Sequence, residues 1–338
     1  GRLLVRLGVL ILEHVELLAQ IEALDVGKPL KQARADAVAM ARYMEFYGGA
    51  ADKIHGETLP YLEGYTVYTL REAHGVTGHI VPWNYPMQII GRSVGAALAM
   101  GNCCVLKPAE EACLSALMFA ELARQAGLPS GVLNVVPGLG AQAGAALAAH
   151  DGINHLSFTG SVATGRLVQA AAAQNVVPVT LELGGKSPQI LFEDADVAAA
   201  LPFLINAGIQ NAGQTCSASS RILVQRSLYD TIVEAMAARY QTLVAKPAIE
   251  DGDLGPLISQ RQKAIVENFL SQGHDLTLAA TGQISDTAPA AGAYVKPHLF
   301  CDVAPSHRLA QQEIFGPVQV IIPFDSDEEA LEIANGTD

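Results

Sequence analysis

The sequence contains few charged residues, few aromatic residues and no cysteine pattern that would brace a small fold. Charged residues make up 16% of the 338 positions and aromatic residues 6%, whereas hydrophobic residues make up 50%. This balance is typical of a globular chain and argues against disorder. The five cysteines, an odd number, fit neither a disulfide framework nor a zinc site. We therefore expect a reducing cytoplasm and no metal site.

Basic residues are also scarce, and long apolar runs are missing. The 21 Lys and Arg residues against 34 Asp and Glu residues give a net charge of −13, which argues against a nucleic-acid partner. No apolar run is long enough to cross a bilayer, so no membrane partner is expected. The apolar segment 1–24 is interrupted by Arg6, Glu13 and His14, and its helical spacing predicts an amphipathic helix rather than a signal peptide.

Strand and helix patterns alternate between residues 76 and 182. The predicted strands are 76–81, 103–106, 132–136, 153–158 and 177–182, and the helices between them are 87–100, 111–126, 141–149 and 162–174. Such alternation implies right-handed crossovers and a parallel sheet, hence an α/β fold. The chain is longer than one core usually serves, so we expect a second domain from Gly184 onward. It holds a helix near 197–211, a strand at 221–225 and a helix near 227–244, while 56–74 could form a hairpin that leaves the first domain.

Three side chains could carry chemistry. Cys216 lies among small and polar residues, where a thiolate can act as a nucleophile, although an ordinary loop thiol explains it equally well. Glu182 ends a predicted parallel strand, where ligands gather, but a carboxylate facing water is the commoner case. Asn84 could donate a hydrogen bond to an oxyanion, yet its local sequence favours an Asn-X-Pro turn that begins a helix.

Two kinds of segment could hold a nucleotide. Lys107 and Glu110 could clamp a ribose, although Pro108 and Glu110 also match the first turn of a helix. For the phosphates, GLGAQA (138–143) matches a dinucleotide fingerprint, and FTGSVATG (158–165) also follows a strand and opens a helix. Spacing alone slightly favours the first loop.

Six segments together resemble the aldehyde dehydrogenase superfamily. PWNYP, LKPAE, FTGS, LELGGKSP, GQTCSASSR and EIFGPV occur in that family's order and near its spacing, and the likeness covers essentially all of the chain. The resemblance implies a Rossmann-type cofactor domain (1–55 and 75–183), an oligomerisation hairpin (56–74) in a homodimer or homotetramer, and an α/β catalytic domain (184–338). Family segments that precede residue 1 and follow residue 338 are missing, so we expect the catalytic domain to be incomplete.

The resemblance also implies an activity, the oxidation of an aldehyde to a carboxylic acid with NAD through a cysteine thioester. Cys216 would be the nucleophile, Asn84 and the Cys216 N–H the oxyanion donors, and Glu182 the general base. The implied cofactor-binding residues are Ile80, Val81, Pro82, Trp83, Lys107, Ala109, Glu110, Gly138, Phe158, Gly160, Ser161, Thr164, Leu183, Gly184, Glu313 and Phe315. Within this set, the resemblance assigns the pyrophosphate to the FTGS loop instead of the GLGAQA loop. Gly138 would flank the adenine, and Glu313 would hold the nicotinamide ribose.

Cofactor choice and substrate follow less directly. Glu110 at the adenosine ribose would repel a 2′-phosphate, so we expect NAD over NADP. A coenzyme A-acylating enzyme is disfavoured by the presence of Glu182, and an inactive nucleotide-binding relative by the intact catalytic residues. The chain has Arg92-Ser93 where many members have Trp-Lys, and the aldehyde stays unidentified. Tyr85 and Met87 suggest either an apolar tunnel or core packing.

Overall fold

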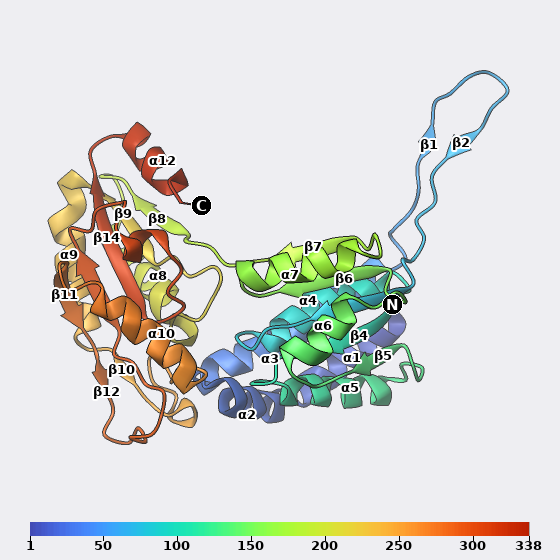
Figure 1. The fold of residues 1–338 in the computed structure, drawn as a ribbon, viewed down its shortest axis with the longest axis horizontal. Helices are drawn as coiled ribbons and strands as arrows, with labels where there is room; N and C mark the ends of the chain where they lie inside the picture. Colours follow the sequence, from blue (N-terminus) through green and yellow to red (C-terminus); the bar gives the residue numbers. More distant parts are fainter. Residues whose placement is uncertain (338) are drawn as a thin grey trace. The chain divides into compact units, whose positions relative to one another are not determined.

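The computed structural model describes residues 1–337, which divide into two compact units (Figure 1). The first unit comprises residues 1–25 and 33–183, and the second comprises 26–32 and the chain from residue 184 onward. One division therefore falls between Leu183 and Gly184. The assignment of 26–32 to the second unit has no counterpart in the sequence patterns.

A five-stranded parallel sheet forms the centre of the first unit. Its strands are β3 (Val76–Ile80), β4 (Cys103–Lys107), β5 (Leu133–Val135), β6 (His155–Thr159) and β7 (Val179–Glu182). They run in the order β5-β4-β3-β6-β7, and every neighbouring pair is parallel, which confirms the predicted sheet. The order reverses at β3, which has the next strand in sequence, β4, on one side and β6 on the other. In open α/β sheets, ligands bind at such a switch point, beyond the carboxyl ends of the strands.

The helices of this unit are α1 (Arg2–Glu13), α2 (Val15–Val26), α3 (Leu30–Ala50), α4 (Pro86–Ala99), α5 (Leu114–Ala126), α6 (Ala145–Ala148), which continues the π-turn Gly140–Gly144, and α7 (Val162–Ala173). The amphipathic N-terminal segment is helical as predicted, but it breaks at His14. One expectation was wrong: α5 begins at Leu114, so Pro108 and Glu110 lie in the turn before it rather than in its first helical turn.

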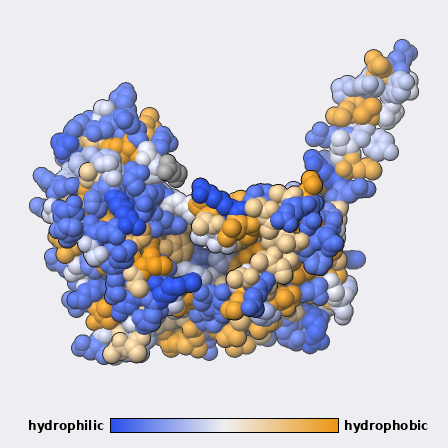
Figure 2. Space-filling model, in the orientation of Figure 1, coloured by the Kyte–Doolittle hydropathy of each residue, from blue (hydrophilic) through white to orange (hydrophobic). Residues whose placement is uncertain are grey.

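The hairpin is a thin arm of the first unit (Figure 1). Only β1 (Thr58–Leu59) and β2 (Val67–Tyr68) pair, in antiparallel register, so the paired strands cover a small part of the predicted hairpin 56–74. Tyr61, Leu62 and Tyr65 are exposed on the arm, and hydrophobic patches run along it in Figure 2. A two-stranded hairpin of this kind is at best marginally stable by itself in water.

The second unit is built on a mixed sheet. The strands β8 (Pro188–Leu191), β9 (Arg221–Gln225), β14 (Val318–Phe324) and β13 (His298–Cys301) are parallel, and β11 (Thr277–Thr281) is antiparallel to β13. The short strands β10 (Val244–Ala245) and β12 (Gln283–Ile284) pair separately. Its helices are α8 (Val197–Ile209), α9 (Tyr229–Tyr240), α10 (Gln260–Ser271), α11 (Arg308–Gln311) and α12 (Asp327–Asn335). Both β9 and β14 are almost entirely buried, as expected for the centre of a covered sheet. Within residues 1–337, no helix is long and apolar enough to span a membrane.

Candidate functional site

Most of the predicted cofactor-binding residues of the first unit lie at one edge of its sheet. Val81–Asn84 follow β3, Lys107 ends β4, Gly160 and Ser161 follow β6, and Glu182 ends β7. Because these strands are parallel and adjacent, their carboxyl ends meet at the same edge. The predicted parallel sheet already implied a shared edge, but the sequence could not show which of these strands are neighbours.

Asn84 sits at the entry to helix α4. Its side chain is 4% exposed, and the helix begins two residues later with Pro86 at its first position. Asn84 therefore lies in the turn that begins the helix, as its local sequence predicted, and this turn places the residue at the sheet edge. Tyr85 and Met87 belong to the hydrophobic core of the first unit, so the core reading holds for both and the apolar-tunnel reading does not.

Lys107 and Glu110 form an ion pair at the end of β4. Lys107 Nζ donates to Glu110 Oε2 over 2.9 Å, and the backbone N–H of Gly140 donates to Glu110 Oε1 over 3.2 Å. Partial burial raises the pKa of Glu110, but the bonds from Lys107 and the backbone outweigh it, so the pKa is lowered. The GLGAQA loop thus already faces an ionised carboxylate, which disfavours a phosphate there and argues against the fingerprint reading.

The FTGS loop offers a better phosphate position. Ser161 caps the twelve-residue helix α7 by accepting a hydrogen bond from the Thr164 N–H over 3.3 Å. A Cβ on Gly160 would lie 2.6 Å from the ring of Phe158, so the backbone there admits no side chain without a shift. A helix N-terminus of this kind attracts anions.

In the second unit, the candidate residues lie at the amino ends of neighbouring strands. Gly184 and Gly185 precede β8, Cys216 precedes β9, and Glu313 and Phe315 precede β14. The strands β8, β9 and β14 are adjacent and parallel, with Arg221 of β9 in register with both neighbours. The candidate residues of the second unit therefore lie at the amino ends of their strands, whereas those of the first unit lie at carboxyl ends.

A constrained loop presents Cys216. Asn211, Ala212 and Gly213 have φ values of 48°, 54° and 74°, a left-handed run that costs free energy for the two residues with a Cβ. The buried side chain of Gln214 holds the run in place, because it donates to the Asn211 carbonyl over 3.0 Å and accepts from the Ile258 N–H over 2.9 Å. Such strain persists only where the surroundings enforce it.

The same loop presses against the segment EIFGPV. A Cβ on Gly213 would lie 2.1 Å from the Gly316 carbonyl oxygen, so only glycine permits this approach. Cys216 itself is partly buried, and within residues 1–337 its backbone N–H has no hydrogen-bond partner. A free N–H beside the sulfur can serve as an oxyanion donor.

Glu313 packs against the glycine pair that precedes β8. Its Oε1 accepts from the Gly185 N–H over 3.4 Å, and a Cβ on Gly184 would lie 2.1 Å from Oε2. Burial raises the pKa of Glu313, partly opposed by the Gly185 bond and by Lys186. The backbone of Gly184 and Gly185 therefore approaches the Glu313 carboxylate closely and positions it.

Lys186 is a buried cation that the sequence reasoning missed. Its side chain is 6% exposed, and its Nζ has no hydrogen-bond partner within the described chain. Burial, then the charge of Arg221, lowers the pKa of Lys186 to about 7, against a smaller opposing effect of Glu313. Its place directly after two glycines gave no signal of burial.

The remaining cysteines differ from Cys216. All five are free; Cys104 and Cys301 are buried, and burial raises the pKa of each thiol to about 11. Thiolates at these two positions are thus suppressed at neutral pH. Within residues 1–337 no three His, Cys, Asp or Glu side chains are arranged to hold a metal ion.

Comparison with known proteins gives a consistent result over the whole chain. A family model described as "Aldehyde dehydrogenase family" matches residues 1–338. The hydroxyisobutyraldehyde dehydrogenase of Mycolicibacterium austroafricanum is 41% identical over 99% of the chain, which spans 67% of that protein. A putative aldehyde dehydrogenase structure from Burkholderia cenocepacia is 62% identical with a TM-score of 0.99, covering 100% of this chain and 72% of its own. An NAD⁺ complex of a Bacillus cereus aldehyde dehydrogenase is 43% identical with a TM-score of 0.95, covering 99% and 69%.

Proposed function

Because the chain belongs to the aldehyde dehydrogenase family, we propose that it oxidises an aldehyde to a carboxylic acid with NAD through a thioester on Cys216. The observation that carries the proposal is the Cys216 loop. A left-handed backbone run at 211–213 precedes Cys216, and within residues 1–337 the Cys216 N–H has no hydrogen-bond partner.

Each proposed residue has a defined task. The Cys216 thiolate attacks the aldehyde carbon, and the oxygen becomes an oxyanion that the Asn84 amide and the Cys216 N–H stabilise. Losing one such donor typically costs about 3–4 kcal/mol of transition-state stabilisation. A bound NAD would supply the acceptor for the hydride of the aldehyde carbon, whose departure leaves a thioester on Cys216. Glu182 then takes a proton from water, the resulting hydroxide attacks the thioester carbon, and the carbon–sulfur bond breaks to release the acid and the Cys216 thiolate.

The residues present fit a dinucleotide. Lys107 and Glu110, paired at the end of β4, would bind the hydroxyls of the adenosine ribose, and the N-terminus of α7 would face the pyrophosphate. In the second unit, Glu313 would bind the nicotinamide ribose. The ionised carboxylate of Glu110 would repel a 2′-phosphate, which supports NAD over NADP.

Two further parts of the proposal concern assembly and location. The arm around β1 and β2 exposes Tyr61, Leu62 and Tyr65, and such a hairpin needs a partner surface to be stable, which supports a homodimer or homotetramer. The five free cysteines support a reducing compartment such as the cytoplasm.

The test is loss of turnover in Cys216→Ala. We expect NADH formation to fall at least about 1000-fold, because the proposed mechanism places the acyl intermediate on the Cys216 sulfur. Cys113→Ala is the matched control: Cys113 is also partly buried, and it precedes α5 without a side-chain capping bond. Comparable turnover by Cys216→Ala and Cys113→Ala would refute the thioester mechanism.

A further inference from the structure

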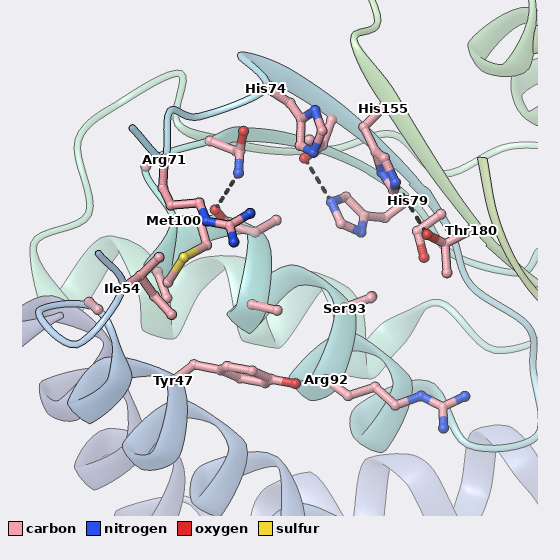
Figure 3. Close-up of a pocket in the computed structure, with 18 of the residues that line it drawn as sticks. Tyr47, Ile54, Arg71, His74, His79, Arg92, Ser93, Met100, His155 and Thr180 are labelled. Atoms are coloured by element: carbon pink, nitrogen blue, oxygen red, sulfur yellow. Dashed lines mark hydrogen bonds between the residues drawn. The ribbon is translucent and has the colours of Figure 1, made fainter. Parts of the chain in front are cut away.

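On one face of the sheet in the first unit, the part formed by β3, β6 and β7 is polar, which is unusual for a parallel sheet between helices. Strand register places Thr77 opposite His155, His79 opposite Ser157, and Thr159 opposite Glu182. These residues line a cavity of about 810 Å³ together with Arg92 and Ser93 of α4. Figure 3 shows His74, His79 and His155 in the upper part of the view, with Ser93 and Arg92 of α4 lower down. The proposed general base thus lies on the wall of a large recess.

Two histidines on this wall, His79 and His155, form hydrogen bonds with threonine side chains. Burial, with a smaller effect of His155, lowers the pKa of His79 to about 4, and burial also lowers the pKa of His155, followed by the effect of His74. Thr77 Oγ1 donates to the Cys103 carbonyl, so it accepts from His79 Nε2 over 2.9 Å. His79 Nδ1 is then a buried acceptor, and it has no partner within residues 1–337. The fixed positive charge of the cavity comes from its arginines.

Arg92 is the arginine in an anomalous position. The side chains of five arginines within residues 1–337 make neither a hydrogen bond nor an ion pair, and four of these residues are exposed: Arg2, Arg6, Arg71 and Arg166. Arg92 is half-buried at the cavity wall, where desolvation makes an unpaired charge costly. Its neighbour Ser93 uses its hydroxyl on the Ile89 carbonyl over 2.8 Å and gives Arg92 no partner. Although the chain has a net charge of −13, the Arg92 guanidinium has no carboxylate partner within residues 1–337.

We propose that this cavity receives the far end of the aldehyde and that Arg92 binds a carboxylate carried there. The inference rests on the proposed function, because it takes Glu182 to lie beside the reacting carbon. A carboxylate would give Arg92 the bidentate partner that it lacks. The substrate class is thus an ω-oxo acid rather than a purely apolar aldehyde, in agreement with Tyr85 and Met87 being core residues.

The kinetic test compares ω-oxo acids of three to six carbons with their methyl esters, which have the same aldehyde and no charge. The wild-type protein should prefer the best acid over its ester in kcat/KM by about 10- to 100-fold, as expected for a charge-assisted hydrogen bond. Arg92→Gln should lose that preference while keeping its rate on the esters, and Arg92→Lys should regain part of it. Arg71→Gln is the matched control, because Arg71 lines the same cavity but is exposed. Equal losses on acid and ester in Arg92→Gln, or a loss in Arg71→Gln instead, would overturn the inference.

A binding test keeps this inference separate from the catalytic proposal. The monoamides of the matching dicarboxylic acids carry an unreactive amide in place of the aldehyde, and their methyl esters remove the charge. Calorimetry should show that the monoamide acid binds the wild-type protein at least about 10-fold more tightly than Arg92→Gln, with no such difference for the ester. Binding that does not depend on Arg92 would overturn the inference whatever the enzyme turns over. Arg92-dependent binding without turnover of any aldehyde would instead refute only the proposed function.

Discussion

The close contact between Gly184 and Glu313 allows the cofactor proposal to be tested with a single methyl group. A Cβ on Gly184 would lie 2.1 Å from Glu313 Oε2, whereas ordinary contact begins at 3.4 Å. In Gly184→Ala the carboxylate must therefore retreat by about 1.3 Å, and its bond from the Gly185 N–H, already 3.4 Å long, is lost. The obstructing atom ends a flexible side chain, so the backbone does not have to move.

The expected effect falls on NAD affinity rather than on stability. Displacing Glu313 removes a charge-assisted hydrogen bond to the nicotinamide ribose, worth about 1.5–3 kcal/mol, so the Kd for NAD should rise about 10- to 150-fold. Stability should change by less than about 1 kcal/mol, because alanine also lowers the entropy of the unfolded chain. Isothermal titration calorimetry with NAD and thermal melts of the same samples measure the two effects.

The neighbouring glycine supplies the control. A Cβ on Gly185 would meet no atom within 4 Å, so Gly185→Ala should bind NAD like the wild type. In a Glu313→Ala background, Gly184→Ala should cause little further loss, since the carboxylate it displaces is gone. Unchanged NAD affinity in Gly184→Ala, or an equal loss in Gly185→Ala, would show that Glu313 does not hold the cofactor as proposed.

Three further predictions test other parts of the account. Because burial lowers the pKa of Lys186 to about 7 from 10.5, the unfolded chain binds more protons than the native one between these values, so stability should rise with pH there. The Tm gain of Lys186→Met over the wild type should therefore shrink from pH 6 to pH 9, and a gain independent of pH would contradict the assignment. Glu110→Gln removes the charge that faces a 2′-phosphate, so the ratio of Kd values for NADP and NAD should fall about 10-fold, and an unchanged ratio would refute the role of Glu110. Gly213→Ala forces a Cβ to within 2.1 Å of the Gly316 carbonyl oxygen, so it should lower Tm and turnover together; a variant with wild-type values of both would show that the close approach is dispensable.

The sequence predicted the alternating strands and helices of the first unit well, because the signals for them are local. The parallel strands around Val76–Ile80 and Cys103–Lys107 alternate with helices of ordinary length, and the structure confirms the sheet. The start of α5 was misplaced, because Pro108 and Glu110 suit a helix start equally well as a turn. Helix α3 gave no prediction, since its residues Leu30–Ala50 mix small and polar side chains without a clear stripe.

The site was harder to predict, because its constraints act between distant residues. Cys216 and Glu313 were found through motifs, but nothing near either one indicates that β9 and β14 are adjacent. The burial of Lys186 and the isolation of Arg92 depend on which side chains surround them in three dimensions. A local pattern cannot reveal a missing ion pair, and the polar row around His79 emerges only from strand register.

The central claim is a covalent acyl group on Cys216 that Glu182 helps to release. The most direct measurement treats Glu182→Gln with an aldehyde and NAD, quenches it in acid and maps the acyl mass onto peptides. Trypsin should yield the peptide 187–221, in which Cys216 is the only cysteine. The account predicts that this peptide carries the acyl group and that the adduct disappears when Cys216 is also replaced by alanine. An acyl group on another cysteine, or none while Glu182→Gln still forms NADH at the wild-type rate, would contradict it.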